Sequence, residues 1–515
     1  MSRALLLHVS WIGPGAIALA LQFTRAFKGL YRSEAMDLAQ LGRHLAEGQG
    51  FVTSLLRPVE VALFPRVPAP EIYNAPLYPL TLGVAFGALP HSDAVVAGVS
   101  AVFFLATLIM VYVLASRIFD RATGALAAAL FALNVQALAY AVSGLHVTLW
   151  AFLLTLMVYL IYVNSGSLRL SAAAGAVLAL CWLTEYMTFA LVLPAIAVGA
   201  YAQKERRLRH AAWFAAGLIV VMTPWWVRNY LVARDPLFTL ERYLIVMFTG
   251  AHPGHTLFRA ADASALRLVP LIVGNLGGLL KKIVLGLASA YRAMSPLVGL
   301  YVVGFVVISA MRTLNQPRQN LARNAVLALV LFLILIGAVH NPTPELFFVI
   351  VPLLLVLCAG YFMVLVREWI RPGGWQAVAV LFFVGVAAYP AAVSWAAPEP
   401  KFGPDKRNLS YLEEALPRNA VVVTDAPWAV AWYAHRPAVW LPLGAEDFEA
   451  VDEAVDVRAI YFSTLLQTYP ASEEAVMWQR IYLQGAAPPG FEVTVARDGE
   501  LIMLRSGADA TSGGP

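Results

Sequence analysis

Long apolar runs constrain this chain more than any other feature of its sequence. A helix needs about 20 apolar residues to cross a bilayer, and about eleven runs approach or reach that length. They cover residues 4–23, 94–116, 122–141, 146–163, 170–184, 186–202, 211–231, 295–311, 324–340, 345–366 and 375–396. Hydrophobic residues make up 60% of the 515 and charged residues 13%, whereas soluble domains have about 45–50% and 25%. No soluble core could bury so much apolar surface, so we predict an all-α polytopic membrane protein with about 11 transmembrane helices.

Basic residues are confined to alternate turns between these runs. Lys and Arg occur at residues 117–121, 169, 204–209, 312–323 and 367–371, and the intervening turns near 142–146, 184–186 and 340–345 have none. Cytoplasmic loops are enriched in Lys and Arg, so we place the basic turns and the N-terminus in the cytoplasm. The Pro- and Gly-containing piece 76–89 is short for a span, and we expect it to lie in the outer interface. Because this rule accounts for the basic charge, no nucleic-acid partner is expected.

This topology places three parts of the chain outside the membrane. They are a first outer loop (24–93), a second outer segment (229–294) and the C-terminal part, which follows the membrane domain 1–396. Residues 397–515 hold 9 Lys and Arg against 17 Asp and Glu, whereas the preceding residues hold 27 against 14. This change in charge indicates a separate extracytoplasmic domain, 397–506, followed by a small polar tail, 507–515, that we expect to be disordered.

The C-terminal domain has the pattern of a small α/β unit. Buried-strand runs occur at 420–424, 438–441 and 458–462, and a helix is predicted to begin near Pro427, after the first of them. A final pair of strands, 491–496 and 501–504, flanks Asp498-Gly499. Asp-Gly is the dipeptide that favours a tight β-hairpin turn, so this pair is predicted to be a hairpin.

Two carboxylates stand out in the first outer loop. Residues 34–46 have a composition typical of a helix, and Glu34 and Asp37 lie three residues apart in its first turn. Residues at this spacing are neighbours on a helix surface, so the two carboxylates could act together. Carboxylates are also favoured at a helix N-terminus for electrostatic reasons alone, and this stretch by itself leaves both interpretations open.

Four stretches in order resemble a known family. They are Glu34–Phe51, Ala75–Pro79, Arg117–Arg121 and Pro224–Tyr230. Together they resemble the GT-C glycosyltransferases of the protein O-mannosyltransferase and lipid A aminoarabinose transferase type (glycosyltransferase family 39-like), especially bacterial relatives. The resemblance covers about residues 1–400 and implies a multi-pass protein of the bacterial inner membrane.

The resemblance implies a reaction on the outer face of the membrane. A polyprenyl-phosphate-linked sugar is the donor, and the acceptor is a lipid, a glycan or a protein. An acidic residue of the first outer loop takes the proton of the acceptor hydroxyl, and the sugar is transferred with inversion. Glu34 stands at the family's position, although the family usually has Asp there, and Asp37 is the alternative base.

The resemblance also suggests residues that bind substrate. Arg228, beside Trp225 at the outer end of a span, is the candidate ligand of the donor phosphate, with Lys281, Lys282 and Arg259 as further candidates. Side chains expected to line the substrate cavity are Asn74, Tyr78, His146, Glu185 and Trp225. His146 and Glu185 stand where many relatives have other residues; they are candidates for the acceptor site because they are ionisable at this depth, and polar helix ends that face water are an equal interpretation. Some relatives have Glu-Lys where this chain has Tyr73-Asn74, so the phosphate contact made by that Lys is either missing here or supplied by another residue.

Other functions and a metal cofactor stay open at this point. A transporter or flippase of lipid-linked substrates usually has polar groups near the bilayer midplane, whereas the ionisable residues here concentrate at the outer edge. A non-catalytic assembly protein is the third alternative. The sequence identifies neither the sugar nor the acceptor, and it leaves open whether a divalent metal takes part.

Overall fold

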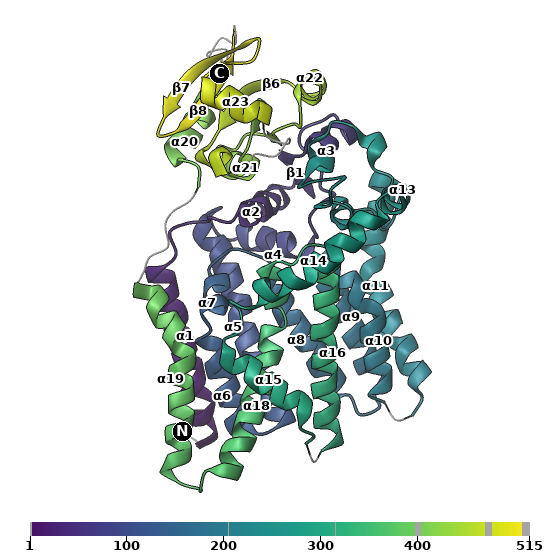
Figure 1. Cartoon of the computed structure of the whole chain (residues 1–515), viewed down its shortest axis with the longest axis vertical. Coiled ribbons are helices and arrows are strands. Elements are labelled where there is room, and N and C mark those ends of the chain that lie inside the picture. The colour runs from purple at the N-terminus through teal and green to yellow at the C-terminus, as the bar shows by residue number, and fades with distance from the viewer. Residues whose placement is uncertain (1–2, 204, 315, 397–402, 469–475, 507–515) are drawn as a thin grey trace.

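The computed structural model describes residues 3–203, 205–314, 316–396, 403–468 and 476–506. Long helices form one end of the molecule and a small domain with a β-sheet forms the other (Figure 1). The N-terminal helix begins at the far end from the sheet. The predicted disordered tail, 507–515, lies outside the described residues.

Each predicted apolar run falls on helical structure. The helices concerned are α1 (Arg3–Arg25), α5 (Asp93–Ile118), α6 (Arg121–Ala132), α7 (Val135–Ala141), α8 (Val147–Val163), α9 (Leu168–Thr184), α10 (Val192–Tyr201), α11 (Arg207–Ala233), α15 (Leu300–Met311), α16 (Pro317–Val339), α18 (Val351–Trp369) and α19 (Gly374–Ala396). Within the described ranges, five helices are long and apolar enough to cross a membrane, or up to seven if each of two bent helix pairs is one span. The chain is therefore a multi-pass membrane protein, and the eleven apolar runs include shorter and broken helices.

One break in these helices has a local cause. Helices α6 and α7 meet at an angle of 65°. The Asn134 side chain accepts a hydrogen bond from the Ala137 backbone N–H at 2.9 Å and so caps α7, and its amide donates to the Leu297 carbonyl at 3.1 Å. An Asn that satisfies a free helix end favours a new helix start at that residue.

Glycines allow two of the long helices to approach closely. On α9, a Cβ at Gly175 would lie 1.8 Å from the Phe214 carbonyl oxygen of α11. On α11, a Cβ at Gly217 would lie 2.0 Å from the Ala172 carbonyl oxygen of α9. Small residues at such crossings are typical of membrane helices, where close backbone packing drives association.

The basic turns gather at the end of the molecule opposite the sheet. Arg367 pairs with Asp120 at 2.6 Å, joining the α18–α19 turn to the α5–α6 turn. Arg312, after α15, pairs with Glu368 at 2.5 Å. This common end agrees with the positive-inside pattern, and the cytoplasmic assignment of the N-terminus stays a prediction.

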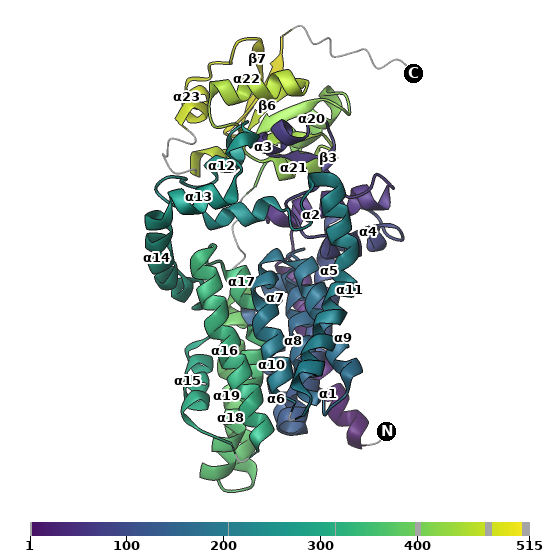
Figure 2. The ribbon, with the colours of Figure 1, turned by 90° about the vertical axis from the view of Figure 1, so that its right-hand side faces the viewer.

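Short helices of the outer segments form a layer beneath the sheet (Figures 1 and 2). Helix α2 (Ser33–Ala46) packs against α4 (Leu77–Phe86), which is the piece expected in the interface. A Cβ at Gly42 would lie 2.6 Å from Leu82 Cβ, so the glycine allows this contact. The rest of the layer consists of α3 (Pro58–Leu63), η2 (Leu240–Ile245) and α12 (Thr256–Arg259). Helices α13 (Leu268–Gly274) and α14 (Leu276–Met294) form the second bent pair, at 81°, and α14 packs against α16.

The C-terminal domain contains the predicted strands and one strand from elsewhere. The sheet order is β2 (Leu55–Leu56), β5 (Ala438–Trp440), β4 (Val421–Thr424), β6 (Val457–Phe462), β8 (Glu500–Arg505) and β7 (Phe491–Arg497). The first four strands are parallel, and β7 and β8 form the predicted hairpin. Strand β2 belongs to the first outer loop, and nothing in the sequence predicted that it would extend this sheet.

The helices of the domain are α20 (Lys406–Ala415), α21 (Pro427–Tyr433), α22 (Ala445–Ala454) and α23 (Val476–Gln484). The end of α21 is bonded to the helical part. Arg43 of α2 donates to the carbonyls of Ala431 at 2.7 Å and Trp432 at 3.1 Å. The Trp432 indole N–H and the Tyr433 hydroxyl donate to the two carboxylate oxygens of Asp93 at 2.8 and 2.9 Å. These charge-assisted bonds are of the stronger class, and they hold the domain over α2.

Candidate active site

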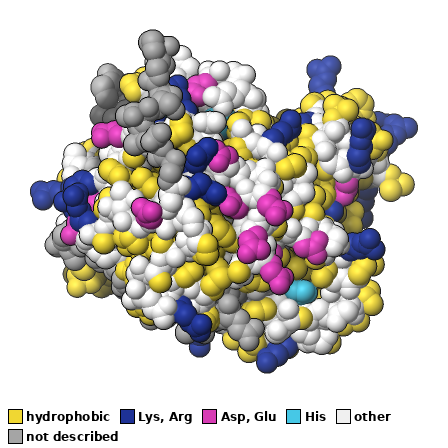
Figure 3. Space-filling view, turned by 90° about the horizontal axis from the view of Figure 1, so that it is seen from above, with side chains coloured by type: hydrophobic (Ala, Val, Ile, Leu, Met, Phe, Trp, Pro, Cys, Tyr) yellow, Lys and Arg dark blue, Asp and Glu magenta, His cyan; other side chains and the backbone are white. Residues whose placement is uncertain are grey.

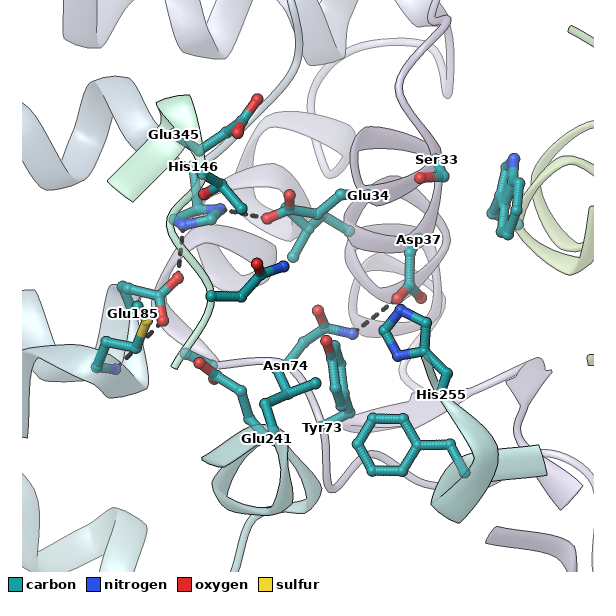
Figure 4. A pocket seen from close by; sticks show the side chains of 18 of the residues that line it. Ser33, Glu34, Asp37, Tyr73, Asn74, His146, Glu185, Glu241, His255 and Glu345 are labelled. Carbon is teal, nitrogen blue, oxygen red and sulfur yellow. Dashed lines mark hydrogen bonds and ion pairs between the residues drawn. The ribbon is translucent and has the colours of Figure 1, made fainter. Parts of the chain in front are cut away.

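A cavity of about 480 Å³ lies where the sheet domain meets the helices. Five of the residues expected at the substrate site line it, namely Glu34, Asp37, Asn74, His146 and Glu185. Figure 4 shows Glu34 directed toward His146 and Asp37 directed toward Asn74, with Glu185 on the other side of His146. The cavity therefore brings together residues that are far apart along the chain.

Asp37 is buried in the cavity wall and held in one orientation. One carboxylate oxygen accepts a hydrogen bond from the Gln40 amide at 3.1 Å, and the other accepts one from the Asn74 amide at 2.9 Å. Burial raises the pKa of Asp37, and the nearby Arg57 guanidinium and the two amides offset this only in part. A carboxylate in this setting has a higher proton affinity than an exposed one.

Glu34 points to the opposite side of the cavity, where it is paired with a histidine. His146 Nδ1 lies 2.8 Å from Glu34 Oε1, and His146 Nε2 lies 3.0 Å from Glu185 Oε2 (Figure 4). Burial by itself would lower the pKa of His146, but the two carboxylates outweigh burial and raise it to about 10. His146 is therefore an imidazolium at neutral pH, between two carboxylates.

This row of ionisable groups continues to two residues that sequence reasoning missed. Glu241, on η2, lies beside Glu185, and burial together with the Glu185 carboxylate raises the pKa of Glu241 well above its ordinary value. His340 Nε2 lies 3.6 Å from Glu241 Oε1, and burial lowers the pKa of His340 to about 4. The signal for His340 was present in the sequence, because an ionisable residue at the end of an apolar run is a functional candidate.

A second, mostly apolar cavity of about 570 Å³ adjoins the first. The two cavities share Met187, Glu241 and His340 in their walls. Trp225 lines the apolar cavity, as does Arg242, which pairs with Asp235 at 2.6 Å. The polar cavity and the apolar cavity therefore lie side by side, and two of the three residues that they share, Glu241 and His340, are ionisable.

Two predicted substrate ligands lie outside the linings of both cavities. The Arg228 guanidinium donates to the Glu71 carbonyl at 2.6 Å and lies 4.9 Å from the Trp225 ring centre. The Tyr78 hydroxyl is buried and forms a 2.8 Å hydrogen bond with Ser100. The Trp225 ring lies between Arg228 and the apolar cavity, whereas the Tyr78 hydroxyl is bonded to Ser100.

The remaining predicted phosphate ligands also lie outside the two cavities. Lys282 is buried and donates to the Leu244 carbonyl at 2.6 Å. Arg259 is buried and donates to the Leu441 carbonyl at 2.7 Å, which ties the second outer segment to the sheet domain. Lys281 is exposed. A sequence shows the charge of Lys282 and Arg259 but not the backbone carbonyls that accept their hydrogen bonds.

The sheet domain supplies part of the cavity wall, which the sequence did not predict. Trp428 and Trp440 line the cavity, and so does Arg57, directly after β2. Arg57 pairs with Glu60 at 3.2 Å and lies 3.7 Å from the ring centre of Tyr73. Over the described ranges, no group of three or more His, Cys, Asp or Glu side chains is arranged to hold a metal ion.

Comparison with known proteins identifies the fold. No protein-family profile matches the chain, and no curated protein sequence matches it. The apo crystal structure of ArnT from Cupriavidus metallidurans superposes with a TM-score of 0.60 over 98% of both chains, at 12% sequence identity. The oligosaccharyltransferase AglB from Archaeoglobus fulgidus superposes with a TM-score of 0.58 over 97% of this chain and 74% of that one, at 14% identity. The chain has the GT-C fold.

A third GT-C neighbour is the mycobacterial arabinofuranosyltransferase AftD, with a TM-score of 0.50, 16% identity, and coverage of 98% of this chain and 40% of that one. All three neighbours are glycosyltransferases, so the resemblance drawn from the four sequence stretches is confirmed at the level of the GT-C fold. ArnT has been solved with undecaprenyl phosphate, and AglB with an inhibitory peptide and a dolichol-phosphate.

Proposed function

We propose that this protein transfers a sugar from a polyprenyl-phosphate donor to an acceptor hydroxyl inside the polar cavity. The observation that carries the proposal is the junction of the two cavities. A lipid-linked sugar has an apolar chain and a polar head. The apolar cavity could hold the chain and the polar cavity the head, because the two cavities meet at Met187, Glu241 and His340. The GT-C fold supports this proposal, because its neighbour ArnT binds undecaprenyl phosphate.

Asp37 is the general base in this proposal. The position implied by family resemblance is Glu34, but Glu34 Oε1 is already occupied by the His146 imidazolium at 2.8 Å. Asp37 has one amide donor on each oxygen, which leaves a lone pair of each carboxylate oxygen for an acceptor hydroxyl. Burial raises its pKa, and a base works best when its pKa approaches the working pH.

The reaction is a single displacement at the anomeric carbon. Asp37 takes the proton of the acceptor hydroxyl as the acceptor oxygen bonds to the anomeric carbon. The bond between that carbon and the phosphate oxygen breaks on the opposite side, so the configuration inverts and polyprenyl phosphate leaves with the bonding electrons. Arg242 lines the apolar cavity and Arg228 lies behind Trp225, and we assign these two cations to stabilise the charge of the leaving phosphate.

The Glu34–His146–Glu185 row lies on the donor side of the cavity. Its carboxylates can accept hydrogen bonds from sugar hydroxyls, and the imidazolium keeps the two carboxylates apart at fixed positions. We assign this row to the orientation of the donor sugar. The His146–Glu185 pair is largely buried, and a buried ion pair is costly to break, whereas Glu34 is 40% exposed; the His146–Glu185 pair is therefore the fixed part of the row.

The test is donor consumption by the purified full-length protein in lipid nanodiscs. Synthetic undecaprenyl-phosphate sugars (mannose, glucose, galactose, N-acetylglucosamine and arabinose) are supplied with an extract of bacterial envelope lipids and glycans, and free undecaprenyl phosphate is measured by mass spectrometry. This product is common to every donor and acceptor. We expect at least one donor to be consumed by the wild-type protein.

Variants separate catalysis from background hydrolysis. The Asp37→Asn/Glu34→Gln double variant should release no undecaprenyl phosphate above background. Glu47→Gln is the matched control, because Glu47 is an exposed carboxylate at the end of the same helix. If the wild-type protein cleaves none of the donors in nanodiscs but moves them across the bilayer of sealed proteoliposomes, the protein is a flippase and the proposal is wrong.

A further inference from the structure

The wall of the polar cavity opposite the ion-paired row is aromatic. Tyr73, Phe248, His255, Phe258, Trp428 and Trp440 line it. His255 is at the centre of this group: its ring centre lies 5.2 Å from that of Trp440 and 5.0 Å from that of Phe248. Phe258 is 6.1 Å from His255 and 5.8 Å from Tyr73, so these five rings are connected. The proposed donor site, on the other side, uses none of these rings.

The position of the two tryptophans follows from the sheet topology. Strands β2, β5 and β4 are parallel neighbours, so their carboxyl ends lie at one edge of the sheet. Trp440 ends β5, and Trp428 lies just after β4, at the start of α21. The carboxyl edge of a parallel sheet is where open α/β domains bind their ligands. In this protein that edge faces the membrane cavity.

Two further features of this wall point to a ligand. Phe248 has a backbone φ of +59°, a conformation that is strained for a bulky residue and clusters at ligand-binding sites. The Nδ1 atom of His255 is shielded from solvent and has no hydrogen-bond partner within the described ranges. Burial, with Arg57 and Arg259, lowers the pKa of His255 to about 4. A neutral imidazole can donate to a hydroxyl group or accept from one.

From these contacts we infer that the aromatic wall is an acceptor subsite for a neutral saccharide, so that the acceptor hydroxyl is a sugar hydroxyl. A pyranose ring has an apolar C–H face and a polar rim of hydroxyls. The C–H face packs on aromatic rings, whose faces carry partial negative charge, and the rim meets Asp37 and His255. This inference rests on the proposed function for its acceptor role but makes a binding prediction of its own.

The charge of the site selects against anionic acceptors. Five carboxyl side chains line the cavity, namely Glu34, Asp37, Glu185, Glu241 and Glu345, against the two cations Arg57 and His146. Asp and Glu side chains also gather on the outward face of the C-terminal part (Figure 3), which holds 17 of them against 9 Lys and Arg. A phosphorylated or otherwise acidic glycan would approach against this field, whereas a neutral one would not.

Binding is measured first, without any donor. The full-length protein in nanodiscs is mixed with neutral manno-, gluco- and galacto-oligosaccharides at millimolar concentration and examined by saturation-transfer difference NMR. We expect at least one series to receive saturation, with the largest effect on the protons of one ring face. Trp428→Leu and Trp440→Leu should reduce this signal at least fivefold, and Trp428→Phe should restore most of it. Trp375→Leu is the control, because Trp375 is 75% exposed on α19.

A sugar-transfer assay then tests whether the saccharide that binds is also the acceptor. With a donor that the wild-type protein consumes, Trp428→Leu should raise the acceptor KM at least tenfold, whereas the control Trp375→Leu should leave the acceptor KM unchanged. The inference is wrong if none of the neutral saccharides binds, if both tryptophan variants bind and transfer normally, or if peptides bearing Ser and Thr are the only acceptors. Saccharide binding without cleavage of any donor would refute the proposed function and leave the saccharide site supported.

Discussion

The assignment of Asp37 as the base leads to a direct test by two single substitutions. Asp37→Asn retains the size of the side chain and one oxygen for the Asn74 or Gln40 amide, but it removes the proton acceptor. Loss of a general base costs about 10²–10⁴ in rate, which is about 3–5 kcal/mol of barrier at 1.36 kcal/mol per tenfold. We expect kcat to fall by this factor, with the donor KM nearly unchanged.

The effect on stability should be much smaller than the effect on rate. A hydrogen bond to a charged group contributes about 1.5–3 kcal/mol, and Asp37→Asn weakens two of them. The substitution also removes the cost of burying a carboxylate, whose pKa burial raises. These effects oppose each other, so the free energy of unfolding should change by less than about 2 kcal/mol. Thermal unfolding in nanodiscs measures this change independently of substrate.

Glu34→Gln provides the comparison. The amide oxygen of the substituted side chain can still accept a hydrogen bond from His146, and the Glu34 side chain is 40% exposed, so we expect less than a tenfold loss of kcat. An inactive Glu34→Gln with an active Asp37→Asn would refute the assignment in favour of the position implied by resemblance. The wild-type pH profile is a second check. The ionised base is lost as pH falls through a raised pKa, so the acid limb of kcat/KM should lie above the 3.8 of an ordinary aspartate.

Three other substitutions test the structure itself. The ion pairs raise the pKa of His146 from 6.5 to about 10, so its contribution to stability is complete below pH 6.5 and is lost as the pH rises through 10. The His146→Gln variant should therefore have a lower Tm than the wild-type protein at pH 6.5, and this difference in Tm should shrink toward pH 10. A difference that does not change with pH would contradict the ion pairs. Arg43→Met removes two charge-assisted hydrogen bonds to α21, which contribute about 1.5–3 kcal/mol each. The substitution should therefore speed the exchange of backbone amide hydrogens in α21. Unchanged exchange would mean that other contacts hold the domain. Gly175→Ala should destabilise the protein by about 1–3 kcal/mol through overpacking and so lower its Tm. Gly98→Ala is the control and should not lower the Tm, because nothing lies within 4 Å of the new Cβ. Equal Tm values for the two variants would exclude the close α9–α11 contact.

Much of the fold follows from periodicity and composition. The apolar runs predicted the helices, and the buried run before Thr424 and the hairpin at Asp498-Gly499 were predicted correctly, because strand patterns and Asp-Gly turns are local signals. The break at Asn134 was not predicted, since the apolar run continues through it. Strand β2 is only two residues long, and its pairing with β5 depends on a contact between opposite ends of the chain.

Some of the acidic residues and His146 of the candidate site were predicted, whereas its aromatic wall was not. Glu34, Asp37, His146 and Glu185 could be placed in one layer, because the ends of apolar runs define a depth in the membrane. Depth does not say which residues face each other across a cavity. The ion pairs of His146 and the tryptophans of the sheet domain therefore needed the structure. Basic residues such as Arg259 were predicted to bind phosphate from charge alone, whereas their partners here are backbone carbonyls.

The short strand β2 has a consequence for how the protein assembles. It covers the outer side of β5, and an uncovered strand edge can pair with another chain. The first outer loop is made early in synthesis and its partner strand late, so this pairing can form only after the whole chain between the two strands has been synthesised. Until then neither the sheet nor the cavity beneath it is complete. A separately expressed 403–506 fragment should accordingly self-associate, and addition of a peptide spanning residues 52–58 should reduce that association.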